Sequence, residues 1–154
     1  MANHIATPTE QALHTKLNLQ VANWTVLYTK LHHYHWYVKG TSFFTLHEKF
    51  EQLYNEATAY LDEIAERLLS IGGSPVSTLK ESLELATIKE AKGGESAEEM
   101  VASVVADFES ITDELKQGME AATQADDEAT ADLLLGIVSA LDKHRWMLNA
   151  FIAK

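Results

Sequence analysis

The stretch from Leu31 to Gly73 constrains the fold of this chain more than any other part of the sequence. In its second half, apolar residues recur three or four positions apart, which is the spacing of one face of an α-helix. The residues of this apolar face are Leu46, Phe50, Leu53, Ala57, Leu61, Ile64, Leu68 and Ile71. The pattern predicts a long helix that buries this face in a core.

The same helix carries a second face, formed by His47, Glu51, Asp62 and Glu66. If each residue advances about 100°, and the first core leucine is taken as zero, these side chains lie at roughly 100°, 140°, 160° and 200°. Two residues four positions apart are close enough to share one ion, which gives a His–Glu pair and an Asp–Glu pair. Lys49 lies on another side of the helix, at about 300°, so it does not neutralise this face.

The two pairs cannot meet within one helix, because Glu51 and Asp62 are eleven residues, or about 16 Å, apart. Two copies packed antiparallel about a twofold axis would bring the first pair of one chain opposite the second pair of the other. Asn55, Thr58 and Ala59 lie between the pairs and are small enough to let another backbone approach. This arrangement predicts two equivalent metal sites per dimer. The alternative is an ordinary acidic helix surface on which His47 is one more polar residue.

The motifs HWYVKG, FFTLHEKFEQLY and DEIAERLLSIGGSP together resemble the signature of the Dps family, also called miniferritins. The resemblance runs from about residue 21 to residue 75 and is echoed by LDKHRWM near the C-terminus. It implies an iron-oxidising centre shared by two subunits, with His35, His47 and Glu51 from one and Asp62 and Glu66 from the other. Aspartate is commoner in the family where this chain has Glu51.

The resemblance implies an iron-storage ferroxidase. It would oxidise Fe(II) with hydrogen peroxide, bind up to two irons at each site between subunits, and store Fe(III) mineral in a hollow homo-dodecameric shell, which protects against oxidative damage. Trp36, next to one proposed ligand, would donate an electron to the oxidised centre or pack in an interface. Asp127 and Asp132 would line the openings through which iron enters, although acidic residues at a helix start also stabilise the helix dipole.

The rest of the chain predicts an all-α protein of one domain, residues 1–154, with a loose arm at residues 1–8. Thr9 would cap a first helix over residues 10–39, whose core face is Leu13, Leu17, Val21, Trp24, Tyr28 and Leu31, continued by His35. A histidine there is either a ligand or a buried core residue. His32 and His33 are interpreted as surface or supporting residues.

Residues 72–95 form a crossover in which Thr78 caps a short helix, long enough to make the third long helix parallel to the second. Ser96 caps the third long helix, with core residues Val101, Val104, Phe108, Ile111, Leu115 and Met119. Asp126 or Asp127 starts the fourth, with core residues Leu134, Ile137, Leu141, Leu148 and Phe151. This order is that of a ferritin-like four-helix bundle with one long crossover carrying a short helix.

Composition limits where the protein can act and what it can bind. The chain has no cysteine, no secretory signal and no run of 18 apolar residues, so we expect a cytoplasmic protein without disulfides or membrane contact. Its formal charge of −11 and the lack of a basic tail predict weak or absent DNA binding.

Three alternatives stay open. A DNA-compacting stress protein with secondary iron binding would need a basic contact surface, and its binding would weaken steeply as salt rises. A di-iron or di-manganese oxidase acting on an organic substrate would need an apolar pocket beside the metals. A purely structural bundle would bind no iron.

Overall fold

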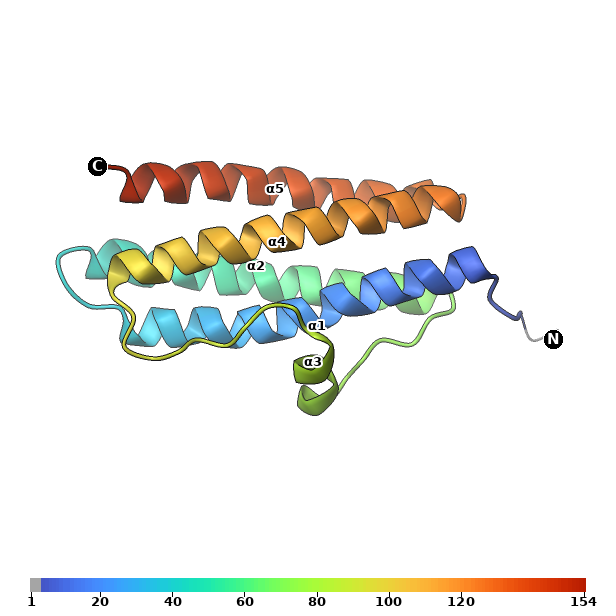
Figure 1. The fold of residues 1–154 in the computed structure, drawn as a ribbon, viewed down its shortest axis with the longest axis horizontal. Coiled ribbons are helices and arrows are strands. Elements are labelled where there is room, and N and C mark those ends of the chain that lie inside the picture. The colour runs from blue at the N-terminus through green and yellow to red at the C-terminus, as the bar shows by residue number, and fades with distance from the viewer. Residues whose placement is uncertain (1–3) are drawn as a thin grey trace.

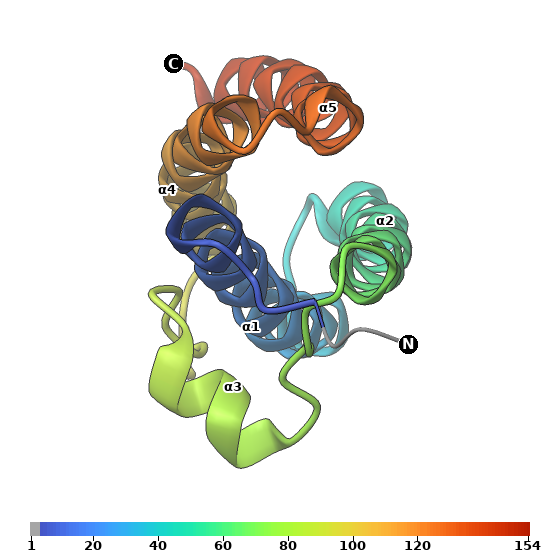
Figure 2. The same ribbon diagram turned by 90° about the vertical axis from the view of Figure 1, so that its right-hand side faces the viewer.

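The computed structural model describes residues 4–154, which form five α-helices and no β-strand (Figure 1). Four long helices make the bundle: α1 (Pro8–Tyr37), α2 (Phe43–Ser70), α4 (Ala97–Gln124) and α5 (Glu128–Ile152). The short helix α3 (Leu79–Leu85) lies outside the bundle against α1 (Figure 2). The predicted all-α bundle with a short crossover helix is confirmed.

The long crossover determines the helix directions. α1 and α2 are joined by a short turn and run antiparallel, whereas the crossover returns the chain so that α4 runs parallel to α2, as predicted (Figure 1). Asn23 of α1 fixes the crossover, because its side-chain oxygen accepts the backbone N–H groups of Thr87 and Ile88 at 2.8 and 3.2 Å. Asn18 accepts the N–H of Val76 in the same way, at 2.9 Å.

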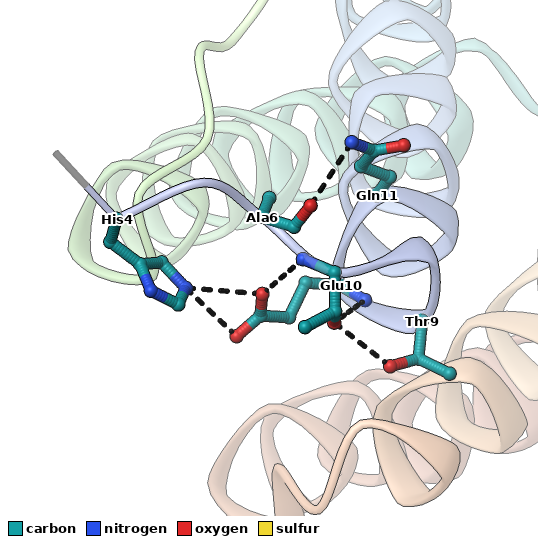
Figure 3. Close-up of polar contacts among 6 residues, drawn as sticks. His4, Ala6, Thr9, Glu10 and Gln11 are labelled. Carbon is teal, nitrogen blue, oxygen red and sulfur yellow. Dashed lines mark hydrogen bonds and ion pairs between the residues drawn. The ribbon is translucent and has the colours of Figure 1, made fainter.

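The first helix begins earlier than the sequence analysis predicts. Thr7, not Thr9, is the N-cap: its hydroxyl accepts the N–H of Glu10, and the Glu10 carboxylate accepts the N–H of Thr7 at 2.6 Å. Pro8 fits the first helical position because it lacks an N–H that would need a partner. His4 reaches the same Glu10 carboxylate (Figure 3). The predicted N-terminal arm starts outside the described residues, at positions 1–3.

The starts of α3, α4 and α5 agree with the predicted caps. Ser96 and Glu99 form a reciprocal capping box at α4, and Thr78 accepts the N–H of Glu81 at α3. Asp127 is the N-cap of α5 and accepts the N–H of Thr130. Each cap satisfies N–H groups that have no partner inside the helix.

The core lies where the helical spacing places it, with two clear exceptions. Tyr28 and Phe151 were predicted as core residues, but both are exposed. Tyr28 packs at the edge of the bundle against His32 and Tyr54, and Phe151 lies in the last turn of α5, where the bundle ends. His35 is buried, as the continuation of the α1 core face predicts. No helix within residues 4–154 is both long and apolar enough to cross a membrane.

Candidate metal centre

His35 and His47 form a reciprocal pair between the end of α1 and the first turns of α2. Nδ1 of His35 lies 2.6 Å from the carbonyl oxygen of His47, and Nδ1 of His47 lies 2.7 Å from the carbonyl oxygen of His35. Because α1 ends at Tyr37, the carbonyl of His35 belongs to a last turn whose carbonyls lack intrahelical partners. The helix end therefore supplies the acceptor that fixes His47.

These hydrogen bonds determine the tautomer of both rings. A carbonyl oxygen can only accept, so Nδ1 must carry the proton in each imidazole. In the neutral rings Nε2 then keeps its lone pair, which is the form in which histidine binds a metal. The two rings stack at 3.7 Å with an angle of 14°, and Phe43 stacks on the outer side of His47 at 5.0 Å. Both rings are thus held in one orientation.

Glu51 lies one helical turn beyond His47 on α2 and is exposed. Its Oε1 accepts a hydrogen bond from the Tyr54 hydroxyl at 3.2 Å. Burial, followed by this contact with Glu51, raises the pKa of Tyr54 above its ordinary value. Tyr54 is not among the residues predicted for the site, although its position three residues after Glu51 on a helix is a usable signal.

Asp62 and Glu66 are exposed on the same helix, nearer its C-terminal end. Asp62 lines a groove of about 660 Å³ together with Asn55, Thr58 and part of the crossover. Within residues 4–154 of one chain, no three His, Asp or Glu side chains lie close enough together to hold a metal ion. The structure brings His35 and His47 together but keeps Asp62 and Glu66 apart from them.

Trp36 lies at the surface beside His32. Its side chain is 66% exposed, and its ring lies 5.3 Å from that of His32. His32 itself donates from Nδ1 to the carbonyl of Tyr28 at 2.8 Å and stacks on Tyr54 at 3.7 Å. His32 therefore belongs to the aromatic surroundings of the pair, as the sequence analysis suggested.

The two acidic residues predicted to line an opening differ in their surroundings. Asp127 is engaged in the fold, because its carboxylate caps α5 and pairs with Arg67 of α2 at 2.9 Å. Burial alone would raise the pKa of Asp127, but the hydrogen bonds from Thr130 and the Arg67 guanidinium lower it on balance. Asp132 is exposed and lines a surface groove with Glu120 and Glu128.

His144 of α5 forms a hydrogen bond with a carboxylate on another helix. Its Nε2 donates to Glu56 of α2 at 2.6 Å, and its Nδ1 accepts from the Lys49 ammonium at 3.4 Å. Burial lowers the pKa of Lys49. The spacing of residues does not predict this network, because its three residues come from α2 and α5. It joins the two helices and gives His144 no free nitrogen.

Comparison with known proteins identifies the family and the fold of this chain. The ferritin-like domain family matches residues 14–154. A relative from Brevibacillus brevis, named DNA protection during starvation protein, is 60% identical over 95% of this chain and 98% of its own length. General stress protein 20U of Bacillus subtilis is 60% identical over 88% of this chain and 94% of its own length.

This chain belongs to the Dps family. A crystal structure of a Dps protein from Bacillus brevis superposes with a TM-score of 0.96 at 59% identity and covers 97% of this chain and 100% of that chain. Dps from Listeria innocua, in a structure soaked with zinc, superposes with a TM-score of 0.89 at 46% identity, over 92% of this chain and 97% of that chain. The ferritin-like fold predicted from the sequence is therefore confirmed.

Proposed function

We propose that this Dps-family protein binds and oxidises Fe(II) at a site shared between two subunits and stores Fe(III) as a mineral inside a hollow, dodecameric shell. The observation that carries the proposal is the reciprocal His35–His47 pair, which fixes two imidazoles by their Nδ1 atoms and leaves the Nε2 atoms for a metal. Two imidazoles of this kind suit iron and other first-row transition metals. Membership of a ferritin-like family favours iron among them.

The remaining ligands complete the site only if a second subunit takes part. Glu51 would add an anionic oxygen beside the histidines, and Asp62 and Glu66 of a partner would close the site from the opposite side. The groove beside Asp62, which Asn55 and Thr58 line together with part of the crossover, would leave room for such a close approach. A twofold axis between two α2 helices would create two such sites at once.

The ligand set explains why oxidation would occur there. Carboxylate oxygens are hard, anionic ligands, so they stabilise Fe(III) more than Fe(II) and favour the loss of one electron from each iron. Two Fe(II) ions together supply the two electrons that cleave the O–O bond of hydrogen peroxide, which takes up two protons to give two molecules of water. Because both electrons arrive together, no hydroxyl radical is released.

Trp36 and the acidic residues of α5 have smaller roles in this proposal. Trp36 is exposed and contacts His32 rather than the histidine pair, so an electron from it would have to pass through His32 or across an interface. Asp132, exposed beside Glu120 and Glu128, is a better candidate for the iron entry path than Asp127, whose oxygens already bind Arg67 and Thr130.

The names of several relatives refer to DNA protection. For this chain, a formal charge of −11 per subunit opposes contact with a phosphate backbone. We therefore propose that it protects by removing Fe(II) and peroxide rather than by covering DNA.

Stopped-flow absorbance on the purified oligomer tests the proposal. His35→Ala combined with His47→Ala removes both imidazoles, and we expect an assembled shell whose peroxide-dependent oxidation of Fe(II) is slowed by at least about tenfold. His4→Ala combined with His14→Ala is the matched control, because it removes two histidines from the N-terminal part of α1 and its cap. An unchanged rate in the first variant would exclude His35 and His47 from the site.

A further inference from the structure

Tyr54 connects the proposed iron ligand Glu51 to the aromatic residues of α1. Glu51 and Tyr54 are three residues apart on α2, so their side chains lie on the same side of the helix. The Tyr54 hydroxyl donates to Oε1 of Glu51 at 3.2 Å. An exposed glutamate has several rotamers, and this bond selects one of them.

The Tyr54 ring is itself held by contacts from the neighbouring helix. Its face stacks on His32 with a centroid distance of 3.7 Å and an angle of 18°. His32 is fixed in turn, because its Nδ1 donates to the carbonyl oxygen of Tyr28 at 2.8 Å. The Tyr54 ring also meets His35 edge to face at 5.3 Å. The hydroxyl that reaches Glu51 is therefore positioned by α1, the helix that supplies His35.

We propose that Tyr54 is a positioning residue that holds Glu51 so that Oε1 accepts its hydrogen bond and Oε2 is left to bind iron. This inference rests on the proposed function of the site. The hydrogen bond uses one of the two lone pairs of Oε1, so a metal binds more favourably through Oε2 than through both oxygens. Tyr54 thus sets both the direction of Glu51 and the number of oxygens it offers.

The length of the residue at position 51 explains why a tether, meaning the hydrogen bond from Tyr54 to Glu51, is useful here. Glutamate has one more methylene than aspartate, so it has one more rotatable bond to order when it binds a metal. Tyr54 orders that bond before iron arrives, which reduces the entropy lost on binding. An aspartate at position 51 is shorter by that methylene and would not reach the hydroxyl in the same way. Tyr54 should therefore matter with Glu51 and matter little with an aspartate in its place.

A double-mutant cycle on the intact oligomer tests this coupling. The four proteins are the wild type, Tyr54→Phe, Glu51→Asp and the combined variant, because Tyr54→Phe removes the hydroxyl and keeps the stacked ring. Co(II) is the probe, since it binds His and carboxylate sites and is not oxidised when no peroxide is added. Binding is measured by calorimetry and by the visible absorption of bound Co(II), which reports its coordination.

We expect Tyr54→Phe to weaken Co(II) binding by about tenfold with Glu51 and by less than about twofold with aspartate at that position. The Co(II) spectrum should change with Glu51, because the freed carboxylate can bind through both oxygens. In Fe(II) oxidation by Tyr54→Phe, the Fe(II) concentration that gives the half-maximal rate should rise by a larger factor than the factor by which the maximal rate falls. Tyr37→Phe removes an exposed hydroxyl beside His33 and should leave all three readouts unchanged.

Two results would overturn the inference, and they can be told apart. If the wild type binds Co(II) and oxidises Fe(II), but Tyr54→Phe has the same affinity and spectrum, the tether alone is wrong. The tether is also wrong if Tyr54→Phe weakens binding equally with Glu51 and with aspartate, because the effect then does not pass through the longer side chain. If the wild type neither binds Co(II) nor oxidises Fe(II), the proposed function fails and this inference fails with it.

Discussion

The Asp127 carboxylate stabilises the fold through contacts with two helices. Its carboxylate caps α5 and accepts from Arg67 of α2, so one side chain both starts a helix and joins it to another. Although burial opposes its ionisation, the hydrogen bonds from Thr130 and the Arg67 guanidinium lower the pKa of Asp127 on balance. A carboxyl group with a lowered pKa in the folded state stabilises the protein above its unfolded pKa, and that stabilisation is lost as the pH falls through the folded value.

Asp127→Asn should therefore lower the thermal unfolding temperature at pH 7. Asparagine still caps a helix, so the loss is that of the charged contact to Arg67, about 1–2 kcal/mol. The difference from the wild type should shrink as the pH falls below about 4, where the unfolded carboxyl is protonated. Calorimetric melting from pH 3 to pH 7 measures it.

Asp126→Asn is the control for that experiment, because it removes one charge from the same turn without an ion pair to Arg67. Asp126 has a positive φ of 55°, which asparagine tolerates. If both variants lose the same stability at every pH, the ion pair contributes nothing and the effect is one of net charge.

At the proposed metal centre, the sequence indicates that His35 and His47 lie close together, but it does not predict how their rings are held. His35 and His47 could be chosen from helical spacing and family resemblance, and the structure places them side by side. Their reciprocal bonds to each other's carbonyls depend on where α1 ends, to within one residue, and periodicity does not resolve such a boundary. The proposed role of Tyr54 also depends on a ring stack with His32 of another helix, which periodicity does not predict.

Helix α1 packs against three other helices, α2, α3 and α4, so most of its sides are covered. It therefore buries polar residues as well as apolar ones. Lys30 is only 5% exposed and pairs with Asp107 of α4 at 2.7 Å, where burial raises the pKa of Asp107. Two buried charges of this kind stabilise the contact between α1 and α4 only as long as both are present.

Asp107→Ala should destabilise the protein by about 3–5 kcal/mol, because it leaves the Lys30 ammonium buried without a counter-charge. Combining Lys30→Met with Asp107→Leu removes both charges and should restore most of that loss. Denaturant unfolding of the three proteins measures the effect. The exposed pair of Asp142 and Arg145 is the comparison, and Asp142→Ala should cost less than about 1 kcal/mol. A double variant no more stable than Asp107→Ala would show that packing, not the unpaired charge, determines the loss.

At the level of helices, periodicity predicted the four long elements, the cap at Thr78 predicted the short helix, and the length of the crossover predicted the direction of α4. The errors are local. Thr9 was chosen as the first N-cap, but Thr7 has the glutamate three residues later that completes a capping box. Tyr28 and Phe151 fit the core spacing, yet one lies at the edge of the bundle and the other at its end. Spacing gives the direction of a side chain but not whether another helix is there to cover it.

For the whole molecule, the main unknown from one sequence is the second subunit. The order of helices and the length of the crossover determine the bundle, because each helix has only a few ways to bury its apolar face. Nothing in that argument determines which surfaces meet another copy. Large apolar residues stay exposed on several helices of the single chain, among them Phe44, Leu69, Leu135 and Trp146. The partner that would complete the proposed site stays a prediction that has to be tested on the assembly.

Mixing two inactive variants tests the shared site directly. One variant carries His35→Ala and His47→Ala, and the other carries Asp62→Ala and Glu66→Ala, so each retains one half of the proposed site. After dissociation and reassembly of an equal mixture, half of the twofold pairs should contain one subunit of each kind, and each mixed pair should have one intact site and one site lacking both halves. About a quarter of the wild-type rate of Fe(II) oxidation should then return. Each variant dissociated and reassembled alone is the control and should stay inactive. If all ligands came from one subunit, the mixture would be as inactive as its components, because neither chain holds a complete set.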